Sequence, residues 1–483
     1  MATGALNTPA TSGLIEGTGY SWGNSMVSIL SRAEYNYDGR YYVSGSFRRD
    51  GSSKLSPDAR WGNFWSVAAS WKINNEKFMR DIDWLSNLRI RGSYGINGTL
   101  PSDNYGWRAL AGYTYKYDGN PGAAITNVLN ANLSWETSYT TNVALEFGFW
   151  DQRLTGTVEY FNRDSKDLLQ DVPISTITGF SSSLQNVGEI NNKGVEIELS
   201  GDIIRKKDIT WDMTLTASFI NSTVTELYGG QDIIWNDPTG GDSRATFIYR
   251  EGESTLAYWG YEWAGVNPDN GLNMWYVNKS ADEEAKMLAD GTAFKHYKDG
   301  RTVVQGEDYN KTNKIIFGDA NPTVYGGINT NVNWKGISLG LNFIYKLGAK
   351  LYDGAEKDCN DDGYYWNRTR SKYVYDNRWR EPGDITDVPK LLGNDPEAAM
   401  AKSSRHLYNG NFLRLKNITL SYNLPKAVVS KVGLGSARVY FNGSNLLTFS
   451  AHKLVDPEVN AYGTRGWETP FCKTYTFGLE FTF

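Results

Sequence analysis

Cysteine and histidine are scarce in this sequence, and their scarcity limits the chemistry it can support. The 483 residues include two cysteines and three histidines. Cys359 and Cys472 are far apart and neither belongs to a CxxC pair, so we expect neither a zinc–cysteine site nor a dithiol redox centre. Whether they pair with each other in an oxidising compartment stays open. The histidines are also widely separated, which leaves a catalytic triad or a metal cluster without support. They are His296, His406 and His452.

Long apolar runs and strong charge of one sign are missing as well. No stretch of about 18 apolar residues occurs, which excludes a membrane protein built from helices. The net charge is −5 with Lys and Arg scattered along the chain, so we expect no nucleic-acid partner. No two carboxylates are marked as an acid and base pair, and we expect neither an enzyme nor a cofactor. The first residues lack a basic start and an apolar core, so we interpret Met1 as an internal boundary rather than the start of a signal peptide.

Aromatic residues and glycine are abundant, with 31 Tyr, 17 Trp, 19 Phe and 50 Gly. The last ten residues alternate strictly between apolar and polar, the pattern of a strand with one oily face. A membrane barrel has such strands and a low mean hydropathy, since only one face of each strand meets lipid. We predict that the apolar row of this last strand is also the signal for barrel assembly. The row is Tyr475, Phe477, Leu479, Phe481 and Phe483.

The same alternation recurs along the chain and predicts about 15 strands, most of them near the 9 to 11 residues that cross a membrane. Short turns such as Asp38 to Arg40 and Lys335-Gly336 alternate with long segments such as 348–411, as in bacterial outer-membrane barrels. The turn at Asp269-Asn270 is assigned to the short-turn, periplasmic side. The predicted strands are residues 26–37, 41–49, 65–73, 88–96, 143–149, 154–163, 194–200, 209–221, 258–266, 272–277, 324–334, 337–347, 412–423, 437–446 and 474–483.

The long segments contain three candidate features. Ser280 to Ala289 has a capping box with Glu283 and predicts a short solvated helix. Asp358, Asn360 and Asp362 match the opening of a calcium-binding loop, but the twelfth position is Thr369 instead of Glu, so a polar turn is the better interpretation. Aromatic loop residues are candidates for substrate binding, because flat apolar faces dock sugar rings and peptide side chains, although they could equally pack the loops together. These candidates are Trp235, Tyr364, Tyr365, Trp366, Trp379 and Trp467.

Several stretches, in the same order along the chain, resemble the SusC/RagA family of TonB-dependent outer-membrane transporters. They cover nearly the whole sequence and include NNKGVEIEL (Asn191 to Leu199), YWGYEWAGVNPDNG (Tyr258 to Gly271) and FLRLKNITLSYNLPK (Phe412 to Lys426). The other stretches run over residues 35–79, 84–99, 317–348 and 437–450, and the closing KTYTFGLEFTF completes the resemblance.

The resemblance implies an all-β transmembrane barrel of 22 antiparallel strands closed by a plug. Residues 1–483 would then be its C-terminal part, with about seven strands, the plug and the signal peptide missing. It also implies import of oligosaccharides or peptides across the outer membrane, a SusD-like surface lipoprotein as partner, and energy from the TonB complex through the missing N-terminal region. The alternative is a soluble or surface all-β binding or adhesion protein. Its strands would bury both faces, whereas here one face is oily and the other polar, which favours contact with lipid.

Overall fold

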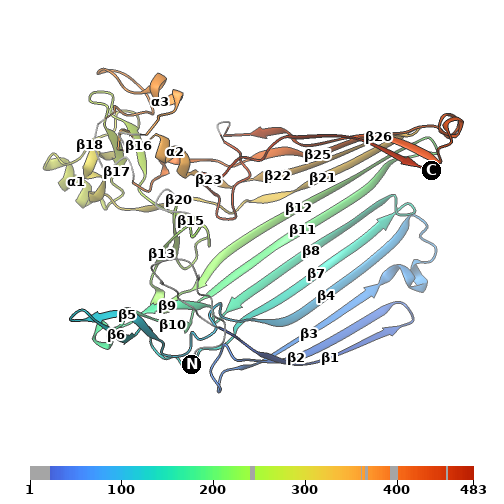
Figure 1. Cartoon of the computed structure of the whole chain (residues 1–483), viewed down its shortest axis with the longest axis horizontal. Helices are drawn as coiled ribbons and strands as arrows, with labels where there is room; N and C mark the ends of the chain where they lie inside the picture. The colour runs from blue at the N-terminus through green and yellow to red at the C-terminus, as the bar shows by residue number, and fades with distance from the viewer. Residues whose placement is uncertain (1–21, 240–244, 361, 365–367, 392–400, 453–454) are drawn as a thin grey trace, which may run out of the picture.

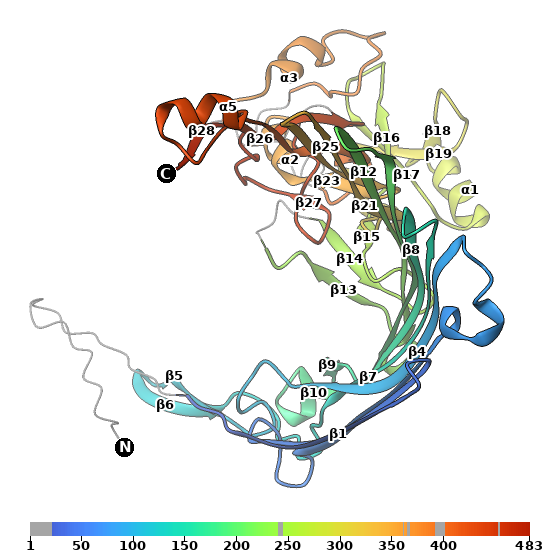
Figure 2. The same ribbon diagram turned by 90° about the vertical axis from the view of Figure 1, so that its right-hand side faces the viewer.

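One large antiparallel sheet of 13 strands organises the molecule (Figure 1). The computed structural model describes residues 22–239, 245–360, 362–364, 368–391, 401–452 and 455–483. Consecutive strands of the sheet are neighbours throughout, and Figure 2 shows the sheet as an open arc with β1 and β28 at its two ends. In order, the strands are β1 (Met26–Tyr37), β2 (Tyr41–Ser52), β3 (Trp61–Lys72), β4 (Leu85–Thr99), β7 (Glu136–Phe149), β8 (Leu154–Lys166), β11 (Glu189–Arg205), β12 (Ile209–Glu226), β21 (Val324–Trp334), β22 (Ile337–Leu347), β25 (Phe412–Asn423), β26 (Ser436–Ser450) and β28 (Thr474–Thr482).

The predicted fold class, an antiparallel barrel wall, is confirmed, but the count of about 15 strands is wrong. The two predicted strands at 258–266 and 272–277 are replaced by three strands of four residues each, too short to cross a membrane. These are β15 (Ala257–Gly260), β16 (Trp263–Val266) and β17 (Asn273–Tyr276), and they belong to two small sheets outside the main one. The turn at Asp269-Asn270 therefore lies among the long loops and not at the short-turn end. The alternation there gave a wrong prediction of membrane-crossing strands, because short strands buried inside a loop show the same two-residue period.

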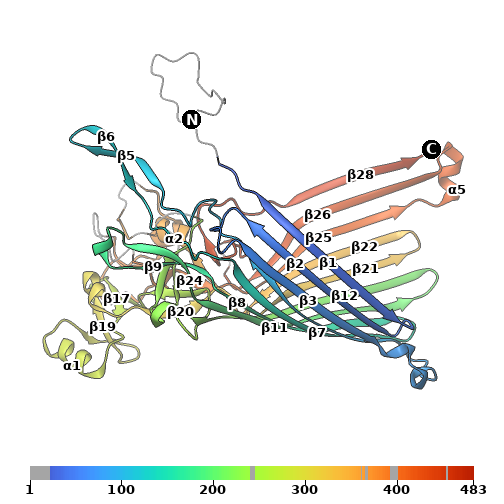
Figure 3. The same cartoon turned by 90° about the horizontal axis from the view of Figure 1, so that it is seen from below.

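Short turns and long loops emerge at opposite ends of the sheet, as predicted (Figure 1). At one end lie tight connections such as residues 38–40 and 335–336, together with α5 (Lys426–Val429). Asp38, Gly39, Lys335 and Gly336 all have positive φ, as the tight turns require. At the other end the chain makes its long excursions, and Figure 3 shows their small sheets gathered beyond the strand ends.

The long loops are themselves folded. Other described elements there are β5 (Ala111–Tyr117), β6 (Asn120–Ile125), β9 (Leu169–Pro173), β10 (Ser182–Asn186), β13 (Ile233–Asn236), β14 (Thr246–Tyr249), β18 (Phe294–Lys295), β19 (Thr302–Gln305), β20 (Ile315–Asp319), β23 (Lys350–Asp353), β24 (Leu407–Asn409), β27 (Thr464–Arg465), α1 (Ala281–Ala289), α2 (Gly354–Cys359) and α3 (Lys372–Asn377). The predicted helix is confirmed as α1, with Ser280 as its N-cap and the capping box to Glu283 present. No helix in the described ranges is both long and apolar enough to cross a membrane. The two cysteines are both free thiols.

The two faces of the sheet differ in polarity. On β7 the apolar face is exposed, with Val143 49% and Leu145 39% accessible, while Glu146 points to the opposite face. The last strand repeats this pattern, and its apolar row from Tyr475 to Phe481 is at least half exposed. Trp84 and Trp334, at the short-turn end, are also more than half exposed. This outward band of apolar side chains edged by aromatics is the surface that lipid covers in outer-membrane barrels.

Candidate functional site: the inner wall and the folded loops

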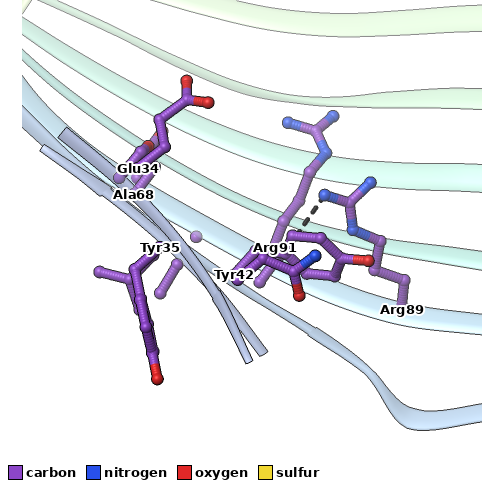
Figure 4. A pocket seen from close by; sticks show the side chains of 13 residues that line it. Glu34, Tyr35, Tyr42, Ala68, Arg89 and Arg91 are labelled. Atoms are coloured by element: carbon purple, nitrogen blue, oxygen red, sulfur yellow. Dashed lines mark hydrogen bonds between the residues drawn. The ribbon is translucent and has the colours of Figure 1, made fainter. Parts of the chain in front are cut away.

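The inner face of the sheet carries a row of charged side chains (Figure 4). Arg89 and Arg91 both point inward because they are two positions apart on β4. The Arg91 guanidinium donates to Glu146 on β7 at 2.9 Å and to Glu159 on β8 at 2.5 Å. Arg89 donates to the Ser70 hydroxyl at 2.9 Å. The alternating pattern and the strand register together place these groups in one polar network.

A hollow of about 650 Å³ lies against this part of the wall. Glu34, Tyr42 and the two arginines supply its polar lining, and Figure 4 shows both guanidinium groups near the Tyr42 ring. Arg89 lies over that ring at 5.7 Å from its centroid. The surface can bind hydrophilic groups by charge-assisted hydrogen bonds.

A second inner hollow, of about 400 Å³, is lined mainly by amide and hydroxyl side chains of β21, β22, β25 and β26. Asn331 donates to Asp212 at 2.9 Å, and the amides of Asn342 and Asn329 are hydrogen-bonded across neighbouring strands. Amide groups offer both donors and acceptors without net charge. The inner wall thus changes from a half lined by charged groups near β4 to an amide-rich half near β22, which also contains Asp212 and Arg438.

Three long loops share one aromatic cluster, which lies at the long-loop end of the strands. Phe247 and Tyr258 come from the loop between β12 and β21, Tyr352 from the loop after β22, and Tyr462 from the loop after β26. The Tyr258 hydroxyl donates to the carbonyl of Gly463 at 2.8 Å, and this buried bond joins two of the loops directly. Burial of the Tyr258 ring raises its pKa well above the ordinary value. The loops therefore form a packed cap and keep a defined shape.

Two of the aromatic candidates for substrate binding contribute to loop packing. Trp235 stacks on Phe247 with ring centroids 4.6 Å apart and also contacts Tyr462. The Trp379 indole donates to the carbonyl of Pro268 at 3.0 Å. A side chain added at Gly271 would collide with the Trp379 ring, so the ring lies directly on that backbone. Both residues fit the packing interpretation better than substrate contact.

Two other candidates are accessible. Trp467 is 66% exposed and donates to Asp358 at 3.2 Å, which fixes its ring at the surface. Tyr364 is 36% exposed. Tyr365 and Trp366 lie outside the described residues.

The three residues of the calcium-loop motif point to different partners. Asp362 forms a buried ion pair with Arg405 and accepts from Asn273 at 2.9 Å. Asn360 contacts Glu356 and the Ser371 hydroxyl. Asp358 accepts from Trp467. The side-chain oxygens of these residues accept hydrogen bonds from protein groups, which agrees with the polar-turn interpretation.

Other functional groups were missed in the sequence because only the register brings them together. The ion pair between β4 and β7 is one example. Another lies in the loops, where His296 and Tyr276 both hydrogen-bond Asp299, at 2.8 and 2.6 Å. The hydrogen bond from Tyr276 lowers the pKa of Asp299 to about 2, and burial together with the same bond raises the pKa of Tyr276 to about 12. Charged residues among the polar positions of neighbouring strands, such as Arg89 and Arg91 on β4 and Glu146 on β7, are the sequence signal that could have revealed the inner-wall network.

Comparison with known proteins gives consistent matches. Residues 3–446 match the family model described as TonB dependent receptor-like, beta-barrel. TonB-dependent receptor P3 of Formosa agariphila is 29% identical over 95% of this chain and 45% of its own length. TonB-dependent receptor SusC of Bacteroides thetaiotaomicron is 29% identical over 98% of this chain and 45% of its own length. The solved structure of the RagAB peptide transporter superposes with a TM-score of 0.79 at 30% identity, covering 95% of this chain and 48% of that chain. The chain thus spans about half the length of these relatives.

Proposed function

The chain belongs to the TonB dependent receptor-like β-barrel family, and we propose that it is the C-terminal barrel wall of an importer of oligosaccharides or peptides. Its place is the outer membrane, as for the SusC and RagA relatives. The observation that carries the proposal is the 13-stranded sheet with an exposed apolar outer face and a polar inner face. Such a wall encloses a hydrophilic path through lipid and does no covalent chemistry.

In this proposal residues 1–483 are one part of a longer protein. A 22-stranded barrel would need about nine further strands, and a plug would fill the lumen. The charged and amide-rich halves of the inner wall supply hydrogen-bonding groups toward that plug or a passing solute. TonB would act through the region ahead of this chain, and a SusD-like surface lipoprotein would cover the folded loops. The apolar row of β28 would serve as the signal for barrel assembly.

The substrate class rests on the relatives and on the chemistry of the loops. One solved relative is named as a peptide transporter. Exposed aromatic groups such as Trp467 suit both sugar rings and peptide side chains. An all-β adhesion protein is the alternative, but it would need another explanation for the wide apolar band on the outer face.

Uptake measured in cells tests the proposal. We expect Trp467→Ala to slow the uptake of a labelled oligosaccharide ladder or a labelled peptide mixture by roughly threefold to tenfold, through loss of one aromatic contact. Trp334→Ala is the matched control, since Trp334 is similarly exposed but lies at the short-turn end. Both variants should reach the membrane at wild-type levels. Equal uptake of both probes by a strain lacking the gene would contradict an import function.

A further inference from the structure

A compact group of three metal-ligating side chains lies where two of the long loops meet. Asp353 ends β23, Glu356 follows in α2, and His452 lies just after β26. One ligand atom from each residue lies within 4.8 Å of the other two. Asp353 is fully buried and His452 is 8% exposed. Asp353 and Glu356 are neighbours in sequence but His452 is almost 100 positions away, so the fold brings His452 to the other two.

Two of the three ligand atoms lack a partner among the described residues. Glu356 Oε2 and His452 Nε2 are buried without a hydrogen bond. His452 Nε2 is 3.8 Å from Asp353 Oδ2, beyond hydrogen-bond range. Buried polar atoms are nearly always satisfied, so two such atoms in one group of possible metal ligands call for a binding partner.

The surrounding side chains hold this arrangement. The Tyr408 ring stacks on the His452 imidazole with centroids 3.8 Å apart and planes 8° apart. Asn360 donates to the other Glu356 oxygen, Oε1, at 3.2 Å. Arg465 on β27 donates to both carboxylate oxygens of Asp353 at 3.0 Å. Metal sites are typically oriented by such outer contacts, which fix the ring and the carboxylates.

We propose that Asp353, Glu356 and His452 bind a divalent transition-metal ion, for which Zn²⁺ is the best match. One imidazole nitrogen and two carboxylate oxygens form a ligand set that zinc uses, with a fourth position left for water. Calcium and magnesium prefer sites made entirely of oxygen, and an imidazole ligand argues against both. Zinc-to-ligand bonds are about 2 Å long, so binding would draw the three ligand atoms closer together by small side-chain rotations.

Charged side chains surround the site. Arg465 also borders a hollow of about 290 Å³ whose lining includes Asp456 and Glu458. Two guanidinium groups lie near the two carboxylates: Arg465 pairs with Asp353, and Arg405, which pairs with Asp362, also acts on Glu356.

A bound ion would join the loop that follows β22 to the loop that follows β26. These loops already meet through the parallel pairing of β23 with β27. The metal would add a second link close to that pairing and hold the folded cap in one arrangement. The site thus acts as a structural clamp.

The proposed site is tested by measuring zinc binding to the outer-membrane protein purified in detergent. This measurement does not depend on transport. After chelator treatment, calorimetric titration with Zn²⁺ should give one ion per chain, and elemental analysis after gel filtration should recover it. We expect His452→Ala and Glu356→Gln to weaken binding at least tenfold. His296→Ala is the matched control, because His296 is also buried in the loops but is held by Asp299.

Heat-modifiable migration on gels checks that each variant folds. Glu356→Gln keeps the size of the side chain, so it carries the test if His452→Ala does not fold. Wild-type protein that binds no stoichiometric zinc would overturn the proposal. So would a folded His452→Ala or Glu356→Gln variant with wild-type affinity.

Discussion

Residues 1–483 expressed behind a signal peptide, with no other part of a barrel, are expected to give no closed, heat-modifiable monomer in the outer membrane. A barrel closes by pairing its first and last strands, which here are β1 and β28. Every neighbouring pair in the sheet is antiparallel, so an odd number of strands leaves β1 and β28 running in the same direction. Bacterial single-chain barrels use even numbers of antiparallel strands. Figure 2 shows these two strands on opposite sides of the open arc.

An open sheet is costly in lipid. Each edge presents backbone N–H and C=O groups that hydrocarbon cannot satisfy, and each such group costs several kcal/mol. Unpaired edges also promote aggregation. Semi-native gels of membranes provide the measurement, with the longer parent protein carrying the same signal peptide and tag as control. A folded monomer of residues 1–483 in good yield would show that this closure argument is wrong.

Arginine at the centre of the outer face should destabilise the complete barrel of the proposed longer protein by about 2 to 4 kcal/mol. Leu145 is a suitable position, since it lies within the apolar band of β7 and is 39% exposed. A charge there would lose its hydration in the lipid core. Thr157→Arg is the matched control, because Thr157 pairs with Glu146 on the inner face at nearly the same height.

Reversible unfolding in denaturant, with the protein in lipid vesicles, gives the free energy of unfolding of each variant. The Leu145→Arg variant should lose stability, while Thr157→Arg should change little because its inner-face surroundings are polar and include Glu146. Equal losses would mean that the two faces do not differ in their contact with lipid.

The sequence predicted the barrel wall well because its signal is local. Alternation along each strand reports one lipid face and one polar face, and it located all 13 strands of the main sheet. Some ends were missed, since β7 begins seven residues before its predicted range and β11 extends five residues beyond each end of its own. The same alternation failed at β15 to β17, where short strands are buried inside a loop. A two-residue period does not distinguish a strand that faces lipid from a strand that is buried in a loop core. Strand length does distinguish them, because four residues are too few to cross a membrane.

The candidate site was harder to predict because it depends on distant contacts. Trp235 and Trp467 are both loop tryptophans, yet one is stacked inside a cluster and the other is exposed. Only the fold of the loops shows which of the two tryptophans is packed and which is exposed. The group formed by Asp353, Glu356 and His452 likewise has no motif, since the loops after β22 and β26 must meet before the three side chains converge.

The most direct test of the central claim is which end of the sheet faces the outside of the cell. Single cysteines are placed at Asp282 in α1 and at Lys207 in the β11–β12 turn, both exposed, in a background with Cys359 and Cys472 replaced by Ser. A membrane-impermeant maleimide is then applied to intact and to lysed cells. A barrel wall with external loops predicts labelling at position 282 in intact cells and at position 207 only after lysis. Labelling of position 207 in intact cells, or protection of position 282, would contradict it.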